Sequence, residues 1–152
     1  MPLLERRALR DGTLLRFTFR DRPSSDKRLS WAWARLDLDL DGRGGGIYLV
    51  AERTGTVVGH AFLESLSLAA TSHVARLTIA VHEGHQRRGV GRALLHELLR
   101  WARSNPRVEK VELQVRSSND GAVALYRSFG FVEEGRKTRR LRIGPNEYLD
   151  DV

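Results

Sequence analysis

The sequence of 152 residues has no cysteine, and this absence excludes several classes of protein at once. Disulfide scaffolds, thiolate zinc sites, iron–sulfur clusters and cysteine nucleophiles all require a thiol. No apolar run is long enough to span a bilayer, and the opening residues, MPLLERRALRDG, lack the apolar stretch of a signal peptide. A chain of this length can fold as one domain without disulfides or metals. We therefore expect a soluble, cytoplasmic, single-domain protein (residues 1–152) that does not engage a membrane.

Acidic residues are few relative to basic ones, 19 against 26, which gives a formal net charge of +7. Such an excess favours an anionic partner, such as nucleic acid or a phosphorylated cofactor, although a solvated, arginine-rich surface gives the same total. Two stretches concentrate the charge. Five arginines lie between Arg87 and Arg103, and RKTRRLR (136–142) holds five basic residues.

The apolar pattern of the second two thirds of the chain predicts a mixed α/β sheet. IYLVAE (47–52) and VVGHAFLE (57–64) form a hairpin, and 73–81 is a further strand. Helical spacing begins at Gly89 and ends at Asn105-Pro106, a stop signal. The remaining elements are a strand at 108–115, a short helix at 120–129 capped by Gly130, and a strand at 131–143.

The first third of the chain is less regular. LLRFTFR (14–20) alternates like a strand, and Asp11-Gly12 suits a hairpin turn, but Asp11 is equally a cap for a first helix. We expect a turn at 20–27, a short helix at 29–38 and a loop at DLDGRGGG (39–46).

HQRRGVGRALL (85–95) places glycines and arginines where a strand passes into a helix. The first N–H groups of a helix have no internal partner, the helix dipole is positive there, and glycine allows an anion to approach the backbone. Arginine adds forked donors for phosphate oxygens. A P-loop is excluded because Val90-Gly91 follow where Lys and Ser/Thr belong, and Leu94 occupies the third glycine of the dinucleotide fingerprint. The histidines of HEGH (82–85) and HELLR (96–100) lack zinc-site spacing.

Gln86-x-x-Gly89-x-Gly91 directly after an apolar strand resembles the pyrophosphate signature of the GNAT N-acetyltransferases. A second block, Asn119 followed by Leu125-Tyr126 and Gly130-Phe131, is similar to the other hallmark of that family. The likeness covers residues 73–135 and is nearest to the bacterial ribosomal-protein-alanine and amino-acid N-acetyltransferase branches. It implies a mixed sheet splayed between two parallel strands, 77–81 and 108–115, with helices on both faces.

The resemblance also implies a cosubstrate and its binding residues. Acetyl-CoA would lie in the opening between the splayed strands, and Tyr126 would be the general acid that protonates the departing thiolate, since a phenol with a pKa of about 10 is protonated at neutral pH. No metal takes part. The residues expected to hold acetyl-CoA are Ile79, Ala80, Val81, Gln86, Arg87, Arg88, Gly89, Val90, Gly91, Arg92 and Asn119.

The glutamates that other members of the family use as the base are missing. The alanine-acetylating branch has one where this sequence has Gln114, and other members have one near Arg76. Glu112 shares the face of Gln114 and is a candidate base acting through water. Four other residues could border the cleft, although a residue of this kind is more often an ordinary surface residue: Glu64, His60, Glu83 and His82.

The remaining alternative to a catalytic base, which we favour, is an acceptor whose amine has a low pKa. An α-amino group, with a pKa near 8, loses its proton more readily than a lysine, with a pKa near 10.4. The candidate acceptor-binding residues are Arg76, Gln114 and Arg116. The two arginines would make the pocket basic and favour a carboxylate-bearing acceptor such as an amino acid.

The leading interpretation is thus an enzyme that moves acetyl from acetyl-CoA to a small amine or a peptide N-terminus. A non-catalytic acyl-CoA sensor of the same fold is the second, in keeping with the missing bases. A nucleic-acid binder using RKTRRLR ranks below both, because no aromatic recognition motif accompanies the charge. NEYLDDV (146–152) reads as a final strand cut short, whose bare edge would favour a homodimer.

Overall fold

The structure is a computed structural model, and it describes residues 5–8, 14–18, 46–53 and 56–152. The expected turn at 20–27, the helix at 29–38, most of the loop at 39–46 and Asp11 lie outside the described residues. The chain divides into two compact units, Met1–Glu112 and Leu113–Val152.

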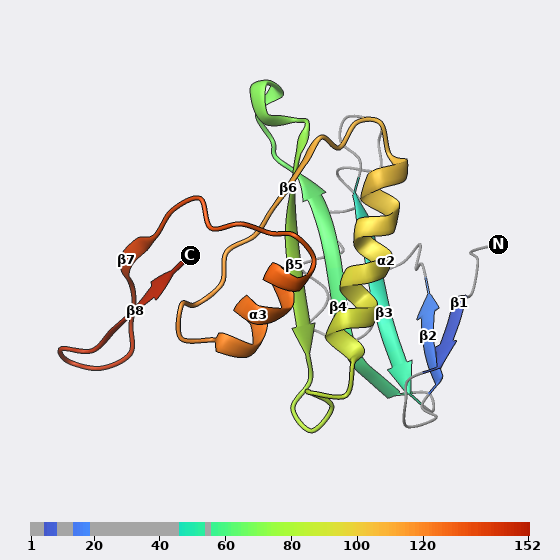
Figure 1. The fold of residues 1–152 in the computed structure, drawn as a ribbon, viewed down its shortest axis with the longest axis horizontal. Coiled ribbons are helices and arrows are strands. Elements are labelled where there is room, and N and C mark those ends of the chain that lie inside the picture. Colours follow the sequence, from blue (N-terminus) through green and yellow to red (C-terminus); the bar gives the residue numbers. More distant parts are fainter. Residues whose placement is uncertain (1–4, 9–13, 19–45, 54–55) are drawn as a thin grey trace. The chain divides into compact units, whose positions relative to one another are not determined.

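The first unit is built on a six-stranded sheet in the order β1-β2-β3-β4-β5-β6 (Figure 1). Every neighbouring pair is antiparallel except β5 and β6, which are parallel. The strand alternative for the N-terminal region is confirmed at 14–18. The strands are β1 (Glu5–Ala8), β2 (Leu14–Thr18), β3 (Ile47–Arg53), β4 (Thr56–Ser65), β5 (Val74–Val81) and β6 (Lys110–Glu112).

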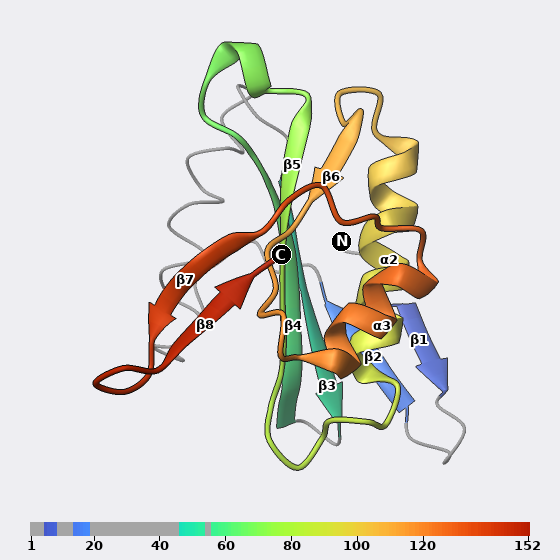
Figure 2. The ribbon, with the colours of Figure 1, turned by 60° about the vertical axis from the view of Figure 1, so that its left-hand side comes forward.

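Helix α2 (Val90–Ser104) lies along one face of this sheet, as Figures 1 and 2 both show. It begins and ends where the glycine–arginine stretch and Asn105-Pro106 predict. Its apolar stripe is buried because apolar residues recur at helical spacing and all meet the same sheet. The buried residues of α2 are Val90, Ala93, Leu94, Leu95, Leu98, Leu99 and Ala102.

The opposite face of the sheet carries its own apolar cluster, formed by Tyr48, Val50 and Phe62 with Val57 packed against it. Since side chains alternate along a strand, these residues face away from those that meet α2. The rings of Tyr48 and Phe62 stack with their centroids 5.8 Å apart. The predicted hairpin of β3 and β4 therefore buries both of its faces.

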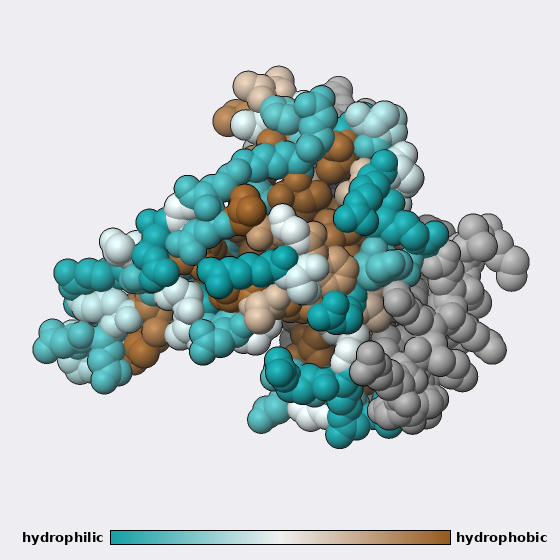
Figure 3. Space-filling model, in the orientation of Figure 1, coloured by the Kyte–Doolittle hydropathy of each residue, from teal (hydrophilic) through white to brown (hydrophobic). Residues whose placement is uncertain are grey.

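The second unit contains helix α3 (Asp120–Ser128) and a hairpin of β7 (Lys137–Arg142) and β8 (Tyr148–Asp151). The strand expected at 131–143 is too long, because strand pairing begins only at Lys137. The exposed side chains of β7 make the visible surface of the hairpin mainly hydrophilic (Figure 3).

The strand expected at 108–115 is also shorter in the sheet, since β6 ends at Glu112. Val115 instead exchanges two backbone hydrogen bonds with Val152, at 3.0 and 2.9 Å, and Ser117 N–H donates to the carbonyl of Asp150. The prediction that the final strand has a bare edge is therefore wrong for its last residues, which have backbone partners on both sides. No helix in the described part of the chain is long and apolar enough to cross a membrane.

Candidate functional site

Strand β5 is paired along its whole length on one side only. It pairs with β4 from Ala75, opposite Ser65, to Val81, opposite Gly59. Parallel pairing with β6 stops after Arg76, opposite Glu112. Within the first unit, no described strand pairs with residues 77–81 on that side. These residues, which we call the open edge of β5, offer backbone N–H and C=O groups to an extended ligand, as an exposed sheet edge offers them to an added strand.

The loop 82–89 joins the open edge to α2 through three residues in the left-handed region. Their φ angles are 81° at Gly84, 61° at Arg87 and 86° at Gly89. Glycine adopts this conformation without steric cost, whereas Arg87 is an uncommon non-glycine case. The Gln86 side chain donates a hydrogen bond from Nε2 to the carbonyl of Val81 at 3.2 Å. The glutamine of the signature therefore ties the loop to the end of β5.

The N-terminus of α2 is uncapped. Gly89 occupies the N-cap position without a side-chain hydrogen bond, and the first turn holds no acidic residue. The first helical bond runs from Ala93 N–H to the carbonyl of Gly89, at 2.9 Å. The N–H groups of residues 90–92 precede that bond and have no partner inside the helix. Arg87, Arg88 and Arg92 are exposed beside them, so backbone dipoles and guanidinium groups together favour an anion.

Gly59 is a site residue that the sequence analysis missed. A Cβ built on Gly59 would lie 3.0 Å from the carbonyl oxygen of Ala80, 3.2 Å from Val90 Cγ1 and 3.3 Å from Leu94 Cδ1. Only glycine therefore lets the first turns of α2 pack this closely on β4, next to the open edge. The signal was present in the sequence, because a glycine within a strand pattern marks a close approach.

A second group of side chains crosses the sheet on the face opposite α2. Glu64, Arg76 and Glu112 are direct neighbours on β4, β5 and β6, so all three project from the same face. Arg76 Nη2 lies 3.3 Å from Glu112 Oε1, in an ion pair with both side chains partly exposed. Glu64 is buried, with 8% exposure. We call these residues the Glu64–Arg76–Glu112 row. From the sequence, Arg76 was expected to bind the acceptor and Glu112 to act as a base through water, but their pairing was not predicted.

Asn119 and Tyr126 lie at opposite ends of α3, in the second unit. Asn119 is the N-cap of the helix, and its Oδ1 accepts a hydrogen bond from Ala122 N–H at 3.1 Å. The capping bond uses the carbonyl oxygen of the side chain and leaves Nδ2 as its donor group. Tyr126 packs edge-on against Phe131, with ring centroids 5.8 Å apart. Burial raises the pKa of the Tyr126 phenol above its ordinary value.

The other predicted residues fall into three places. Gln114 and Arg116 are exposed in the second unit, where the backbone of Arg116 bridges to Asp151. In the first unit, His60 stacks on Tyr48 and meets His82 edge-on, with centroids 6.0 and 6.3 Å apart. Glu83 is exposed in the loop. No described cluster of three His, Cys, Asp or Glu residues could hold a metal ion.

The basic stretch RKTRRLR is less open to an anionic partner than its composition indicates. Arg136 lies 3.5 Å from Asp150, and Arg140 lies 4.0 Å from Asp151. Arg142 donates a 2.9 Å hydrogen bond to the hydroxyl of Tyr148. These contacts within the hairpin weaken the nucleic-acid interpretation.

The open edge of β5, the loop with three left-handed residues and the uncapped start of α2 form the arrangement expected of the acyltransferases whose glycine signature this sequence resembles. Comparison with known families agrees, because residues 10–131 match the Acetyltransferase (GNAT) family. The chain belongs to that family, and the expected mixed α/β fold is confirmed.

Named relatives and solved structures point the same way. The chain is 42% identical over 96 residues to the N-alpha-acetyltransferase RimI of Mycobacterium tuberculosis, covering 63% of this chain and 58% of that protein. It is 38% identical over 103 residues to the L-amino acid N-acetyltransferase AaaT of Escherichia coli, covering 67% and 62%. A putative acetyltransferase from Salmonella typhimurium, solved with its cofactor acetyl-CoA, is 30% identical with a TM-score of 0.68, covering 88% of this chain and 73% of that one. The chain thus spans less than two thirds of these two curated relatives.

Proposed function

We propose that this protein transfers an acetyl group from acetyl-CoA to an amine. The observation that carries the proposal is the continuity of the open edge of β5, the loop 82–89 and the uncapped start of α2. A nucleotide pyrophosphate fits the N–H groups of 90–92 and the arginines beside them. A pantetheine arm fits the backbone of Ile79, Ala80 and Val81 as a further strand would.

In this proposal the chemistry is direct attack of the amine on the thioester that acetyl-CoA supplies. The nitrogen gains the acetyl group and loses a proton, and the sulfur leaves and gains one. Tyr126 donates the proton to the sulfur. Burial raises the pKa of this phenol, so it is protonated at neutral pH and has a proton to donate. Glu112, whose Oε1 already faces Arg76, remains the candidate acceptor of the amine proton through water.

The test is a thiol-release assay with acetyl-CoA against amino acids, polyamines, aminoglycosides and peptides with free N-termini. We expect release with at least one class, and a loss of kcat of about a hundredfold in Tyr126→Phe with unchanged coenzyme A affinity by calorimetry. The isosteric change keeps the ring that packs on Phe131. Tight coenzyme A binding without turnover of any amine would instead favour an acyl-CoA sensor.

Two further expectations from the sequence belong to the proposal, a cytoplasmic location and a homodimer, although the bare edge from which the homodimer was expected is paired at residues 150–152. The absence of cysteine supports the first. Sedimentation at micromolar concentration tests the second, and a monomer there would contradict it.

A further inference from the structure

The Glu64–Arg76–Glu112 row has an arrangement that bears on the acceptor. Its arginine lies between two carboxylates, one on each neighbouring strand. Arg76 Nη2 is already within 3.3 Å of Glu112 Oε1, and Glu64 is directly opposite on β4. Lys110 shares this face but lies two residues farther from the open edge of β5. A carboxylate arriving at Arg76 would therefore have to displace Glu112, and the charge of Glu112 would repel it.

The row also lies at the point where the open edge begins. Arg76 and Glu112 form the last pair between β5 and β6, and the open edge starts at the next residue, Leu77. An extended chain advances by about 3.3 Å per residue, so the edge from Leu77 to Val81 is about 13 Å long. A pantetheine arm that runs from the loop 82–89 back along this edge would therefore end beside the Glu64–Arg76–Glu112 row.

We infer that the row selects acceptor amines that have no free carboxylate beside them, such as a peptide N-terminus, over free amino acids. The inference rests on the proposed function, since it concerns the acceptor of that reaction. It reverses the expectation from sequence, in which Arg76 attracts a substrate carboxylate. That expectation assumed that the Arg76 guanidinium is free to bind a substrate carboxylate. In the fold it forms an ion pair with Glu112.

The test compares L-alanine with L-alaninamide, which differ only in the carboxylate, by kcat/KM for thiol release. The two amines differ in intrinsic pKa, but that difference is the same for every variant, so the change in the amide-to-acid ratio reports on the protein. We expect wild type to prefer the amide. Glu112→Gln frees the guanidinium for a substrate carboxylate and should lower the ratio about tenfold, and Arg76→Gln should raise it.

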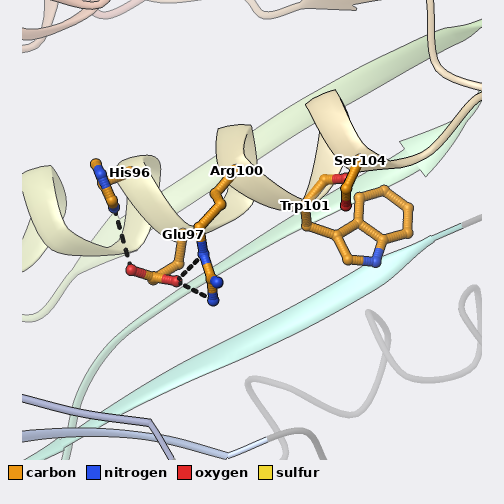
Figure 4. Close-up of polar contacts among 5 residues, drawn as sticks. All are labelled: His96, Glu97, Arg100, Trp101 and Ser104. Atoms are coloured by element: carbon orange, nitrogen blue, oxygen red, sulfur yellow. Dashed lines mark hydrogen bonds and ion pairs between the residues drawn. The ribbon is translucent and has the colours of Figure 1, made fainter.

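The matched control is Arg100→Gln on the exposed face of α2, where Arg100 Nη2 lies 2.8 Å from Glu97 Oε2 (Figure 4). This variant makes the same change of net charge as Arg76→Gln and should leave the ratio unchanged. Two results would overturn the inference for an enzyme that still turns over. The first is an amide-to-acid ratio within twofold of wild type in both row variants, and the second is a wild-type preference for alanine. Absence of release with every amine would overturn the proposed function, and the inference with it. Thermal unfolding of each variant confirms that it folds.

Discussion

The two longer helices of the described chain begin in opposite ways. Helix α3 starts at Asn119, whose side chain accepts from Ala122 N–H, and Asp120 follows in the first turn. Helix α2 starts at Gly89 with no side-chain cap, no acid and arginines around it. A capping side chain and an acidic first turn stabilise a helix by themselves. The start of α2 lacks both, as expected if its donors bind the cosubstrate in the way proposed above.

Making the start of α2 resemble that of α3 is the strongest test of this comparison. Arg92→Glu places an acid in the first turn, which favours the helix dipole but repels a pyrophosphate. We expect coenzyme A affinity to fall about a hundredfold, or about 2.7 kcal/mol, with stability unchanged or slightly higher. Calorimetry and thermal unfolding measure the two effects. Unchanged affinity would mean that the start of α2 does not hold the cosubstrate.

The packing beneath the start of α2 gives the next largest effect. Gly59→Ala brings a methyl group to 3.0 Å from a backbone carbonyl, and we expect a loss of about 2 kcal/mol in the free energy of unfolding. Gly135→Ala is the control, because nothing lies within 4 Å of a Cβ there and its φ is not left-handed. Urea unfolding of both variants checks the difference. Equal stabilities would contradict the close approach of α2 to β4.

Asn119 allows capping and ligand binding to be separated. Asn119→Ala removes both the acceptor and the donor, and should lower stability by about 1 kcal/mol and raise the KM for acetyl-CoA. Asn119→Asp retains the cap but loses Nδ2, so stability should hold while the KM still rises. If the aspartate variant keeps the wild-type KM, Asn119 is a cap and nothing more.

The smallest expected effect concerns the strained residue of the loop. Arg87→Gly and Arg88→Gly each remove one exposed charge, but only Arg87 has a left-handed φ, 61°. We expect the Arg87 variant to be about 1 kcal/mol more stable than the Arg88 variant, with a similar few-fold loss of coenzyme A affinity in both. Chemical denaturation gives the ranking, and equal stabilities would show that Arg87 is not strained.

The start of α2 could be predicted from the sequence because its signals are local. Gly89 is needed for its own φ, and the apolar stripe of α2 repeats within a few residues. The same holds for Gly130 after α3, whose φ is 91°, and for the β3–β4 hairpin. Local backbone preferences and periodicity carry this information directly.

The Glu64–Arg76–Glu112 row could not be predicted in the same way. Its members come from three strands, and their meeting depends on the register of two pairings, one of them parallel. A shift of one residue in either register would send one member to the other face. The early end of the strand expected at 108–115 and the late start of the strand expected at 131–143 have the same origin, since their apolar residues do not reveal which neighbour they pair with.

The capping bond of Asn119 has a consequence for affinity. Because Ala122 N–H holds the amide, its rotation is restricted before any ligand arrives. A partner that accepts from Nδ2 would meet a preorganised donor, and little side-chain entropy would remain to be lost on association.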